Sequence, residues 1–217
     1  MRRAGATTPV VYVHGLWMPG EESLVLGHRI ESDYPLTLHT FRYSTAFASL
    51  ERTLARLAAF VAELDAAEVH FLGHSLGGLI IHRLLERHPD PRPGRVVFLG
   101  TPCVASRAAE QAGRFGPIAQ LMGPSVAAEL LTPHERRWRQ TRTLGIIAGS
   151  QPLGVGQFLA GFEEDNDGTV AVSETRMPGA SAHLVLPVSH VGMLLSARVA
   201  EETGRFLAEG RFAPDSA

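Results

Sequence analysis

A serine flanked by glycines stands where it could act as a nucleophile. Residues Gly73–Gly77 read G-H-S-L-G, which fits the pattern G-x-S-x-G. An apolar run precedes it and a helical run follows it, and in that setting a sharp strand-to-helix turn lifts the Ser75 hydroxyl above the edge of a sheet. The alternative is a glycine-rich turn that binds phosphate at a helix N-terminus. The sequence has neither a lysine nor a G-x-G-x-x-G spacing, which favours the nucleophile.

Ten histidines could supply the base that such a serine needs. His190 follows the last predicted strand, at the carboxyl edge of the sheet, where Ser75 is also expected. His14 and His74 lie within turn motifs, which favours structural roles for them. His183 begins the last predicted strand and therefore lies at the opposite edge. We expect His190 to be the base.

A carboxylate must hold the imidazole of the base in the correct tautomer. Most acids between the serine and the histidine lie in helices or in a long insertion, apart from a cluster at 163–167. Asp167 stands there in the turn Asn166-Asp167-Gly168, before a short apolar run, so its side chain can be held as the chain returns to the sheet. Asp165 is the alternative acid. The cluster could instead be an exposed acidic loop or a calcium site, because both aspartates offer oxygen ligands.

Backbone N–H groups must stabilise the negative charge that forms on the attacked carbonyl oxygen. We expect one donor at Leu76, directly after the nucleophile, and the other at Leu16, in the loop after the first strand. Beside that loop, Trp17 and Met18 suggest an apolar acyl pocket. Four further substrate-binding residues are expected from the insertion: Phe115, Ile118, Leu121 and Met122.

The elements that must position these residues alternate along the chain. Short apolar runs, typical of strands buried on both faces of a parallel sheet, predict strands at 9–13, 36–43, 68–72, 95–99, 143–148 and 182–188. Helical spacing of apolar residues predicts helices at 49–64, 79–88 and 191–207. The expected fold class is therefore α/β, with a mostly parallel central sheet and helices on both of its faces.

The segment 104–142 interrupts this alternation. It carries broken helical patterns, with Gly116-Pro117 and Gly123-Pro124 as breaks, and it predicts a small helical cap. No internal repeat or linker marks a second domain. We therefore expect residues 1–217 to form one domain with the cap as an insertion.

Composition excludes several kinds of chemistry and partner. All 20 basic residues are arginine, which excludes a lysine nucleophile, a lysine base and a P-loop lysine. The net charge of −2 does not favour nucleic acid or an anionic membrane surface as a partner. Cys103 is the single cysteine, so no intramolecular disulfide or cysteine-rich zinc site can form. With no targeting segment and no apolar run of membrane-spanning length, we expect a soluble, cytoplasmic protein without a metal.

Several segments together resemble the α/β-hydrolase superfamily, in particular small bacterial lipases and esterases and the GPI inositol-deacylase-like hydrolases. In chain order they are Val13-His14-Gly15, the turn around Ser75, Leu99-Gly100-Thr101-Pro102, Asn166-Asp167-Gly168 and Ser189-His190-Val191-Gly192. The resemblance spans nearly the whole chain. It implies a triad of Ser75, Asp167 and His190, lipid or acyl-ester substrates, and no cofactor. One departure is the long loop at 149–166, which separates the acid from the preceding strand.

The expected activity is that of a serine hydrolase that cleaves carboxylic esters, of small molecules or lipids, through an acyl-serine intermediate. The same groups could cleave thioesters or amides, so the leaving group stays open. A non-catalytic module that binds a small molecule or a protein on the same scaffold is the alternative from another class. The oligomeric state cannot be read from these residues.

Overall fold

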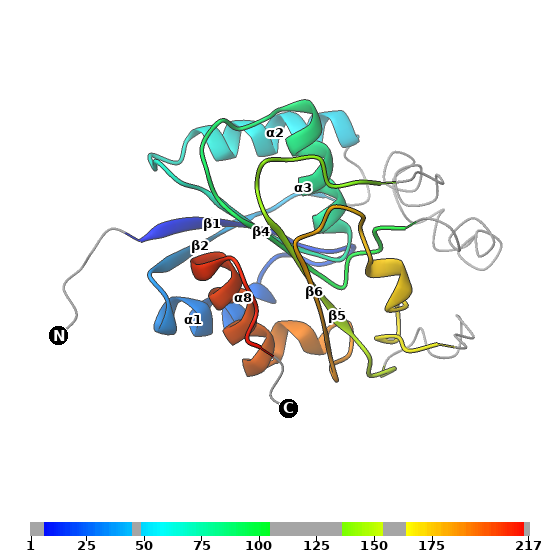
Figure 1. The fold of residues 1–217 in the computed structure, drawn as a ribbon. Coiled ribbons are helices and arrows are strands. Elements are labelled where there is room, and N and C mark those ends of the chain that lie inside the picture. Colours follow the sequence, from blue (N-terminus) through cyan, green and yellow to red (C-terminus); the bar gives the residue numbers. More distant parts are fainter. Residues whose placement is uncertain (1–6, 45–48, 105–135, 154–163, 215–217) are drawn as a thin grey trace.

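The computed structural model describes residues 7–44, 49–104, 136–153 and 164–214. Six strands form one sheet in the order β2-β1-β3-β4-β5-β6, and all five neighbouring pairs are parallel (Figure 1). The strands are β1 (Thr8–Val13), β2 (Leu36–Phe41), β3 (His70–His74), β4 (Val96–Leu99), β5 (Leu144–Gly149) and β6 (Ala182–Leu186). Their carboxyl ends therefore meet at one edge of the sheet, which is where parallel α/β sheets carry their sites.

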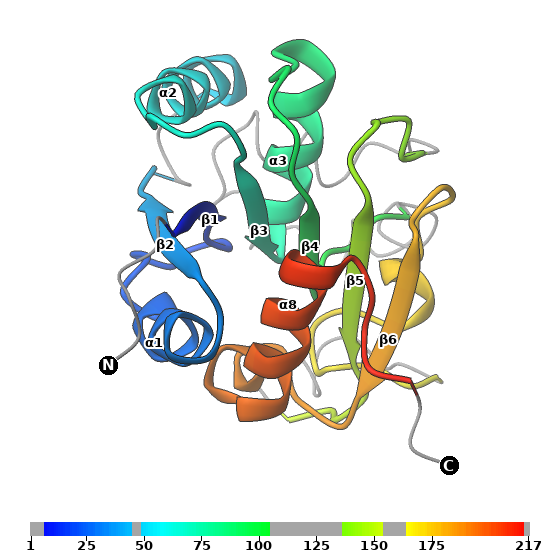
Figure 2. The ribbon, with the colours of Figure 1, turned by 60° about the vertical axis from the view of Figure 1, so that its left-hand side comes forward.

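Helices cover both faces of this sheet (Figure 2). On one face lie α2 (Leu50–Ala62) and α3 (Leu76–Arg87), and on the other lie α1 (Ser23–Asp33) and α8 (Ala197–Glu209). There are also two short 3-10 helices: η1 (Ser173–Thr175), between β5 and β6 in the sequence, and η2 (Gly192–Leu195), between β6 and α8. The predicted α/β class is therefore confirmed.

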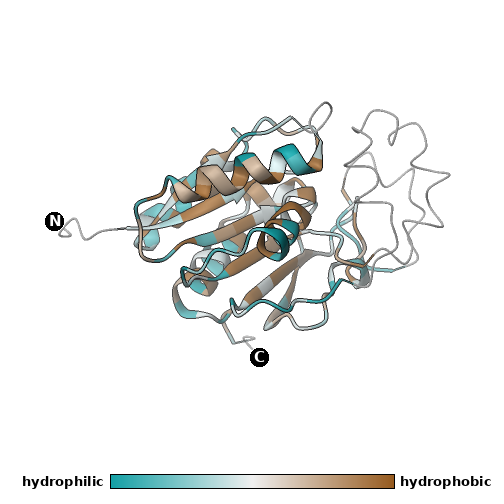
Figure 3. Cartoon of the chain, turned by 90° about the horizontal axis from the view of Figure 1, so that it is seen from above, coloured by the Kyte–Doolittle hydropathy of each residue, from teal (hydrophilic) through white to brown (hydrophobic). Residues whose placement is uncertain are grey.

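Alternation along the strands builds two hydrophobic cores. In β1, Val11 and Val13 pack with α2 and α3, whereas Val10 and Tyr12 pack with α1 and α8. All four side chains are fully buried. Figure 3 shows the hydrophobic residues concentrated on the strands and on the helix faces turned towards them.

Two predicted helices have different bounds in the structure. The helix predicted at 79–88 begins at Leu76, so Gly77 and Gly78 belong to its first turn. A side chain at Gly77 would collide with the backbone of Val13, which is why glycine is needed there. The helix predicted at 191–207 is two helices, because the chain is extended at Ser196, whose side chain accepts the Val199 N–H at 3.3 Å and caps α8.

The helix α1 was not predicted, and most of the predicted cap lies outside the described residues. α1 buries only Ser23, Leu26, Gly27 and Ile30, while the apolar Leu24 and Val25 are exposed, so its apolar residues do not mark a single face. Most of the predicted cap at 104–142 lies outside the described residues, and Phe115, Ile118, Leu121 and Met122 lie outside with it. The single-domain organisation stays a prediction. Among the helices that the structure describes, none is long and apolar enough to cross a membrane.

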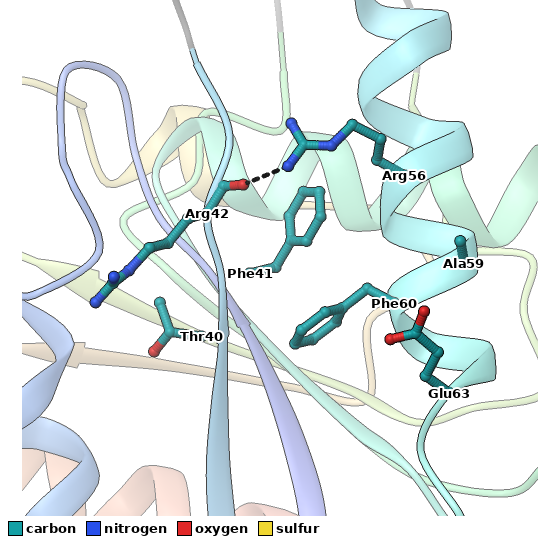
Figure 4. Close-up of a pocket in the computed structure, with 7 residues that line it drawn as sticks. All are labelled: Thr40, Phe41, Arg42, Arg56, Ala59, Phe60 and Glu63. Carbon is teal, nitrogen blue, oxygen red and sulfur yellow. Dashed lines mark hydrogen bonds between the residues drawn. The ribbon is translucent and has the colours of Figure 1, made fainter.

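Strand β2 forms one edge of the sheet, and side chains bond one backbone group of β2 and one of the residue that follows it. The Leu38 N–H donates to the Glu31 carboxylate at 2.7 Å, and the Arg56 guanidinium donates to the Arg42 carbonyl at 3.3 Å. Figure 4 shows the second bond at the mouth of an open groove of about 490 Å³ between β2 and α2. Its lining residues are Thr40, Phe41, Arg42, Arg56, Ala59, Phe60 and Glu63. None of the residues expected to do chemistry lines this groove.

Candidate active site

Ser75 occupies the turn between β3 and α3 in a strained conformation. Its φ is 53° and its ψ is −122°, a region that residues other than glycine rarely adopt. The Ser75 N–H donates to the Leu99 carbonyl at 2.8 Å, and the Ser75 carbonyl accepts the Gly78 N–H at 3.1 Å. These bonds hold the turn while the serine side chain stays partly exposed at the carboxyl edge of the sheet. This is the conformation expected of a nucleophile raised above a sheet.

His190 and Asp167 form a buried pair at the same edge. The imidazole Nδ1 lies 2.7 Å from Asp167 Oδ2, and the His190 N–H donates to the Asp167 carbonyl at 2.9 Å. The other carboxylate oxygen accepts the N–H groups of Thr169 and Val170, at 2.9 and 2.7 Å. An ionised carboxylate only accepts hydrogen bonds, so His190 Nδ1 must be the donor. The Nε2 atom is then left as the proton acceptor that a general base requires.

The structure separates the two candidate acids. Asp167 is fully buried against His190, whereas Asp165 is exposed. The Asp165 backbone carbonyl accepts the Val172 N–H at 2.9 Å, and its carboxylate has no partner among the described residues. The described part of the chain contains no group of three acidic, histidine or cysteine side chains that could hold a metal. Glu163 of the alternative calcium site lies outside that part.

His74 connects the segment that carries the serine with the histidine. The rings of His74 and His190 are 4.8 Å apart, and His74 immediately precedes Ser75. Within the described residues the Ser75 hydroxyl makes no hydrogen bond, to His190 or to any other group. Hydrogen bonds between nucleophile and base often tighten only when substrate is bound.

The loop after β1 lies against the nucleophile. A Cβ atom placed on Gly15 would be 3.2 Å from Ser75 Cβ and 3.4 Å from Met18 Sδ. Trp17 has a φ of 57°, which is unusual for a bulky residue, and its side chain is 54% exposed. Leu16 and Met18 are half-buried on either side of it. Neither the Leu16 N–H nor the Leu76 N–H has a partner in the described chain, as donors for an oxyanion require.

His14 holds this loop in place through hydrogen bonds and ring stacking. Its Nδ1 lies 2.9 Å from the Gly15 carbonyl, and its Nε2 accepts the Tyr43 N–H at 3.3 Å. The Tyr43 hydroxyl donates to the His14 carbonyl at 2.9 Å, and the two rings stack with centroids 4.3 Å apart. Burial lowers the pKa of His14, so the ring stays neutral and keeps both bonds. These contacts give His14 a structural role.

His183 lies away from this site, as expected. Its Nε2 is 2.8 Å from the Thr175 hydroxyl, and burial lowers its pKa to about 4. The sequence predicts it at the opposite edge, and the register Ile146↔His183 puts it near the start of β6.

Two glycines leave the space that the acid–histidine pair occupies. This role was not predicted from the sequence. A Cβ on Gly100 would lie 3.0 Å from Asp167 Oδ2 and 3.1 Å from His190 Nδ1. A Cβ on Gly149 would lie 2.8 Å from Asp167 Cβ. The available signal was their position, since Gly100 directly follows β4 and Gly149 ends β5.

The Gly100→Ala variant tests this clearance. Gly100 has a φ of 54°, so alanine is strained there and its methyl group presses on the acid–histidine pair. We expect a loss of about 1–2 kcal/mol in the free energy of unfolding, measured in urea, and a fall in any hydrolytic turnover of roughly 10-fold or more. Gly210→Ala is the control for backbone strain, because Gly210 has a φ of 80° and a Cβ there would lie nearest to the flexible Arg95 side chain, at 3.1 Å. Equal turnover in the two variants would contradict the clearance role.

Buried neutral histidines make the stability depend on pH. Burial lowers the pKa of His70 to about 4 and, with the neighbouring His190 ring, that of His74 to about 3. The Glu68 carboxylate lies 3.7 Å from His70 Nε2, but it is partly exposed and offsets little of this effect. Above pH 6.5 neither the folded nor the unfolded state binds these protons. Below it only the unfolded state does, so stability falls as the pH decreases towards 4.

We expect the free energy of unfolding to decrease by roughly 2–4 kcal/mol between pH 7.5 and pH 5. Urea unfolding at the two pH values measures it. The His70→Asn variant keeps an acceptor for the Arg95 N–H, which His70 Nδ1 binds at 2.8 Å. It should remove roughly a third of the pH dependence, because the pKa values of His74 and His183 are lowered as well. A stability that is flat over this range would show that these rings are protonated in the folded protein.

Comparisons with known proteins identify the family of the fold. A family model described as the alpha/beta hydrolase fold matches residues 26–188. No protein of curated function matches the sequence. A lipase of Bacillus licheniformis, in its propeptide form, is 18% identical with a TM-score of 0.74, and the match covers 100% of this chain and 53% of the lipase. The chain thus spans about half the length of that lipase.

Two other solved structures are similar over most of both chains. A metagenomic carboxyl esterase is 19% identical with a TM-score of 0.69, covering 96% of this chain and 77% of the esterase. A pyrethroid hydrolase of Sphingobium faniae is 16% identical with a TM-score of 0.66, covering 94% and 98%. At such identities the likeness shows the fold, and the family model covers most of the chain. The protein therefore belongs to the α/β-hydrolase family.

Proposed function

We propose that this α/β hydrolase is a serine esterase that uses Ser75, His190 and Asp167 as a catalytic triad. The observation that carries the proposal is the placement of a serine with a φ of 53° at the same sheet edge as a buried histidine–carboxylate pair. A structural turn needs no strained serine, and burial of the Asp167–His190 pair costs desolvation free energy, so both features favour a catalytic role. Together they supply a nucleophile, a base and the group that orients the base.

The proposed reaction begins when Ser75 Oγ attacks the ester carbonyl carbon. The hydroxyl proton passes to His190 Nε2, while Asp167 accepts from Nδ1–H and stabilises the imidazolium. The N–H groups of Leu16 and Leu76 bind the oxyanion of the tetrahedral intermediate. His190 then returns the proton to the leaving alkoxide, which departs and leaves an acyl-serine. Water, activated by His190, hydrolyses the acyl-serine and restores the free Ser75 hydroxyl.

We propose hydrophobic acyl groups for the substrate. The exposed Trp17 and the half-buried Met18 stand beside the proposed oxyanion donors and can contact an acyl chain. A lipase, a carboxyl esterase and a pyrethroid hydrolase are among the proteins with a similar fold. The cap residues Phe115, Ile118, Leu121 and Met122 would complete the acyl site.

The test is a fluorophosphonate probe followed by a panel of p-nitrophenyl esters of rising chain length, run beside acyl thioesters. An activated serine reacts covalently with the probe, and we expect labelling at Ser75 together with ester turnover. Faster turnover of thioesters would reassign the leaving group. A protein that neither labels nor turns over any ester would be a non-catalytic binding module.

Substrate choice should depend on the cap. Replacing Phe115, Ile118, Leu121 and Met122 with serine should lower kcat/KM for octanoyl esters at least about 10-fold more than for acetyl esters, because each buried methylene contributes about 0.8 kcal/mol. The comparison of the two esters in one variant is its own control. Equal losses on both would mean that these side chains support folding and do not select the substrate.

A further inference from the structure

His74 is a buried titratable residue that the proposed reaction does not use. It ends β3 directly before Ser75, and its side chain is 1% exposed. Its Nε2 lies 3.0 Å from the backbone carbonyl of His190. A carbonyl oxygen only accepts, so Nε2 must carry the hydrogen. In the neutral ring Nδ1 then has none, and in the described part of the chain Nδ1 is buried without a partner.

The surroundings of His74 keep this one tautomer. Complete burial lowers the pKa of the ring to about 3, and the adjacent His190 ring acts in the same direction. The ring is therefore neutral at neutral pH. A neutral ring also places no positive charge beside His190, where charge would oppose formation of the imidazolium.

His190 is held at three atoms. Its N–H donates to the Asp167 carbonyl, its Nδ1–H donates to the Asp167 carboxylate, and its carbonyl accepts from His74. The first two bonds fix His190 relative to the acid. Only the third ties it to the segment that carries the nucleophile, and His74 is covalently joined to Ser75.

His74 also contacts the proposed oxyanion loop. A Cβ on Gly15 would lie 3.0 Å from His74 Nδ1, so the ring packs directly on the backbone before Leu16. One side chain thus touches the nucleophile's segment, the base's segment and the donor loop. These segments are far apart in the sequence, and a change at His74 would alter their spacing.

We propose that His74 is a positioning residue, which sets the distance between the His190 imidazole and the Ser75 hydroxyl by its hydrogen bond to the His190 carbonyl. The inference rests on the proposed triad. It predicts that loss of the N–H at this position slows the chemical step more than it weakens substrate binding, because a misplacement of about 1 Å can cost on the order of 100-fold in rate.

Two variants whose side chains are of similar length isolate the hydrogen bond to the His190 carbonyl. In His74→Gln the amide Nε2 can reach the same carbonyl, whereas His74→Met fills similar space and has no donor. With p-nitrophenyl butyrate we expect His74→Met to lose roughly 10–100-fold in kcat with KM within about twofold. His74→Gln should retain most of the wild-type kcat. Equal losses in both variants, in proportion to lost stability, would overturn the inference and leave His74 a packing residue.

A measurement on the unmodified protein is independent of whether the variants fold. Nitrogen-15 NMR of the histidine rings should show His74 protonated at Nε2 and unprotonated at Nδ1 from pH 5 to pH 8. The opposite tautomer, or a protonated ring, would overturn the inference. Fluorophosphonate labelling of the wild type separates the two proposals. An unlabelled, inactive wild type overturns the triad and this inference together, whereas an active enzyme with equal His74→Gln and His74→Met activities overturns this inference alone.

Discussion

Replacing Ser75 with alanine should abolish ester turnover and fluorophosphonate labelling while the fold is kept. The side chain contributes one oxygen atom and makes no hydrogen bond within the described residues, so its loss leaves the packing around β3 and α3 intact. Loss of the nucleophile in a triad lowers kcat by something on the order of 10⁶-fold. Intact-mass analysis of the labelled protein and hydrolysis of p-nitrophenyl butyrate measure the two effects.

Ser150→Ala is the matched control. Ser150 follows β5 at the same edge of the sheet, is half-buried, and donates from its hydroxyl to the Leu186 carbonyl at 3.3 Å. We expect that variant to label and to turn over ester as the wild type does. Labelling of the Ser75→Ala protein would show that the reactive serine is elsewhere.

Replacing Asp167 with asparagine should lower turnover by about 10⁴-fold with little change of shape. The reason lies in the contacts of the carboxylate. Because Oδ1 accepts the N–H groups of Thr169 and Val170, the amide oxygen of asparagine must occupy that position. The NH₂ group then faces His190 Nδ1 and forces it to accept. The proton moves to Nε2, where it blocks the transfer from Ser75.

Asp165→Asn is the control for charge and sequence position. Its side chain is exposed and lies in the same acidic cluster, so we expect turnover within about twofold of the wild type. Measured kcat/KM values for the two variants decide between the candidate acids. Larger damage from Asp165→Asn would refute the choice of Asp167.

The sheet and the positions of Ser75, Asp167 and His190 at its edge could be anticipated from local patterns. Strands buried on both faces have continuous apolar runs, such as Val10–Val13, and such runs are read without knowledge of the fold. The turn around Ser75 and the turn at Asp167 have local residue preferences of their own. Each of these signals is contained within about five neighbouring residues.

Other features depend on contacts between distant segments or on patterns too weak to predict an element. Gly100 is required because Asp167 and His190 come within reach of it, although they lie far along the chain. The interpretation of His74 as a turn residue missed its bond to His190, which lies 116 positions away. The pattern of α1 was too weak to predict a helix because its apolar residues are not confined to one face: Leu26 and Ile30 are buried, whereas Leu24 is exposed.

The covered edge of β2 has a consequence for how the protein behaves at high concentration. An edge strand with free N–H and carbonyl groups can add a strand from another molecule, and repeated addition leads to aggregation. Here an arriving strand would have to displace the Glu31 carboxylate from the Leu38 N–H and the Arg56 guanidinium from the Arg42 carbonyl. Both side chains are exposed and charged, and charged side chains at an edge strand disfavour pairing with another strand. One acidic residue, Glu31, and one basic residue, Arg56, therefore disfavour self-association of the protein through this edge of the sheet.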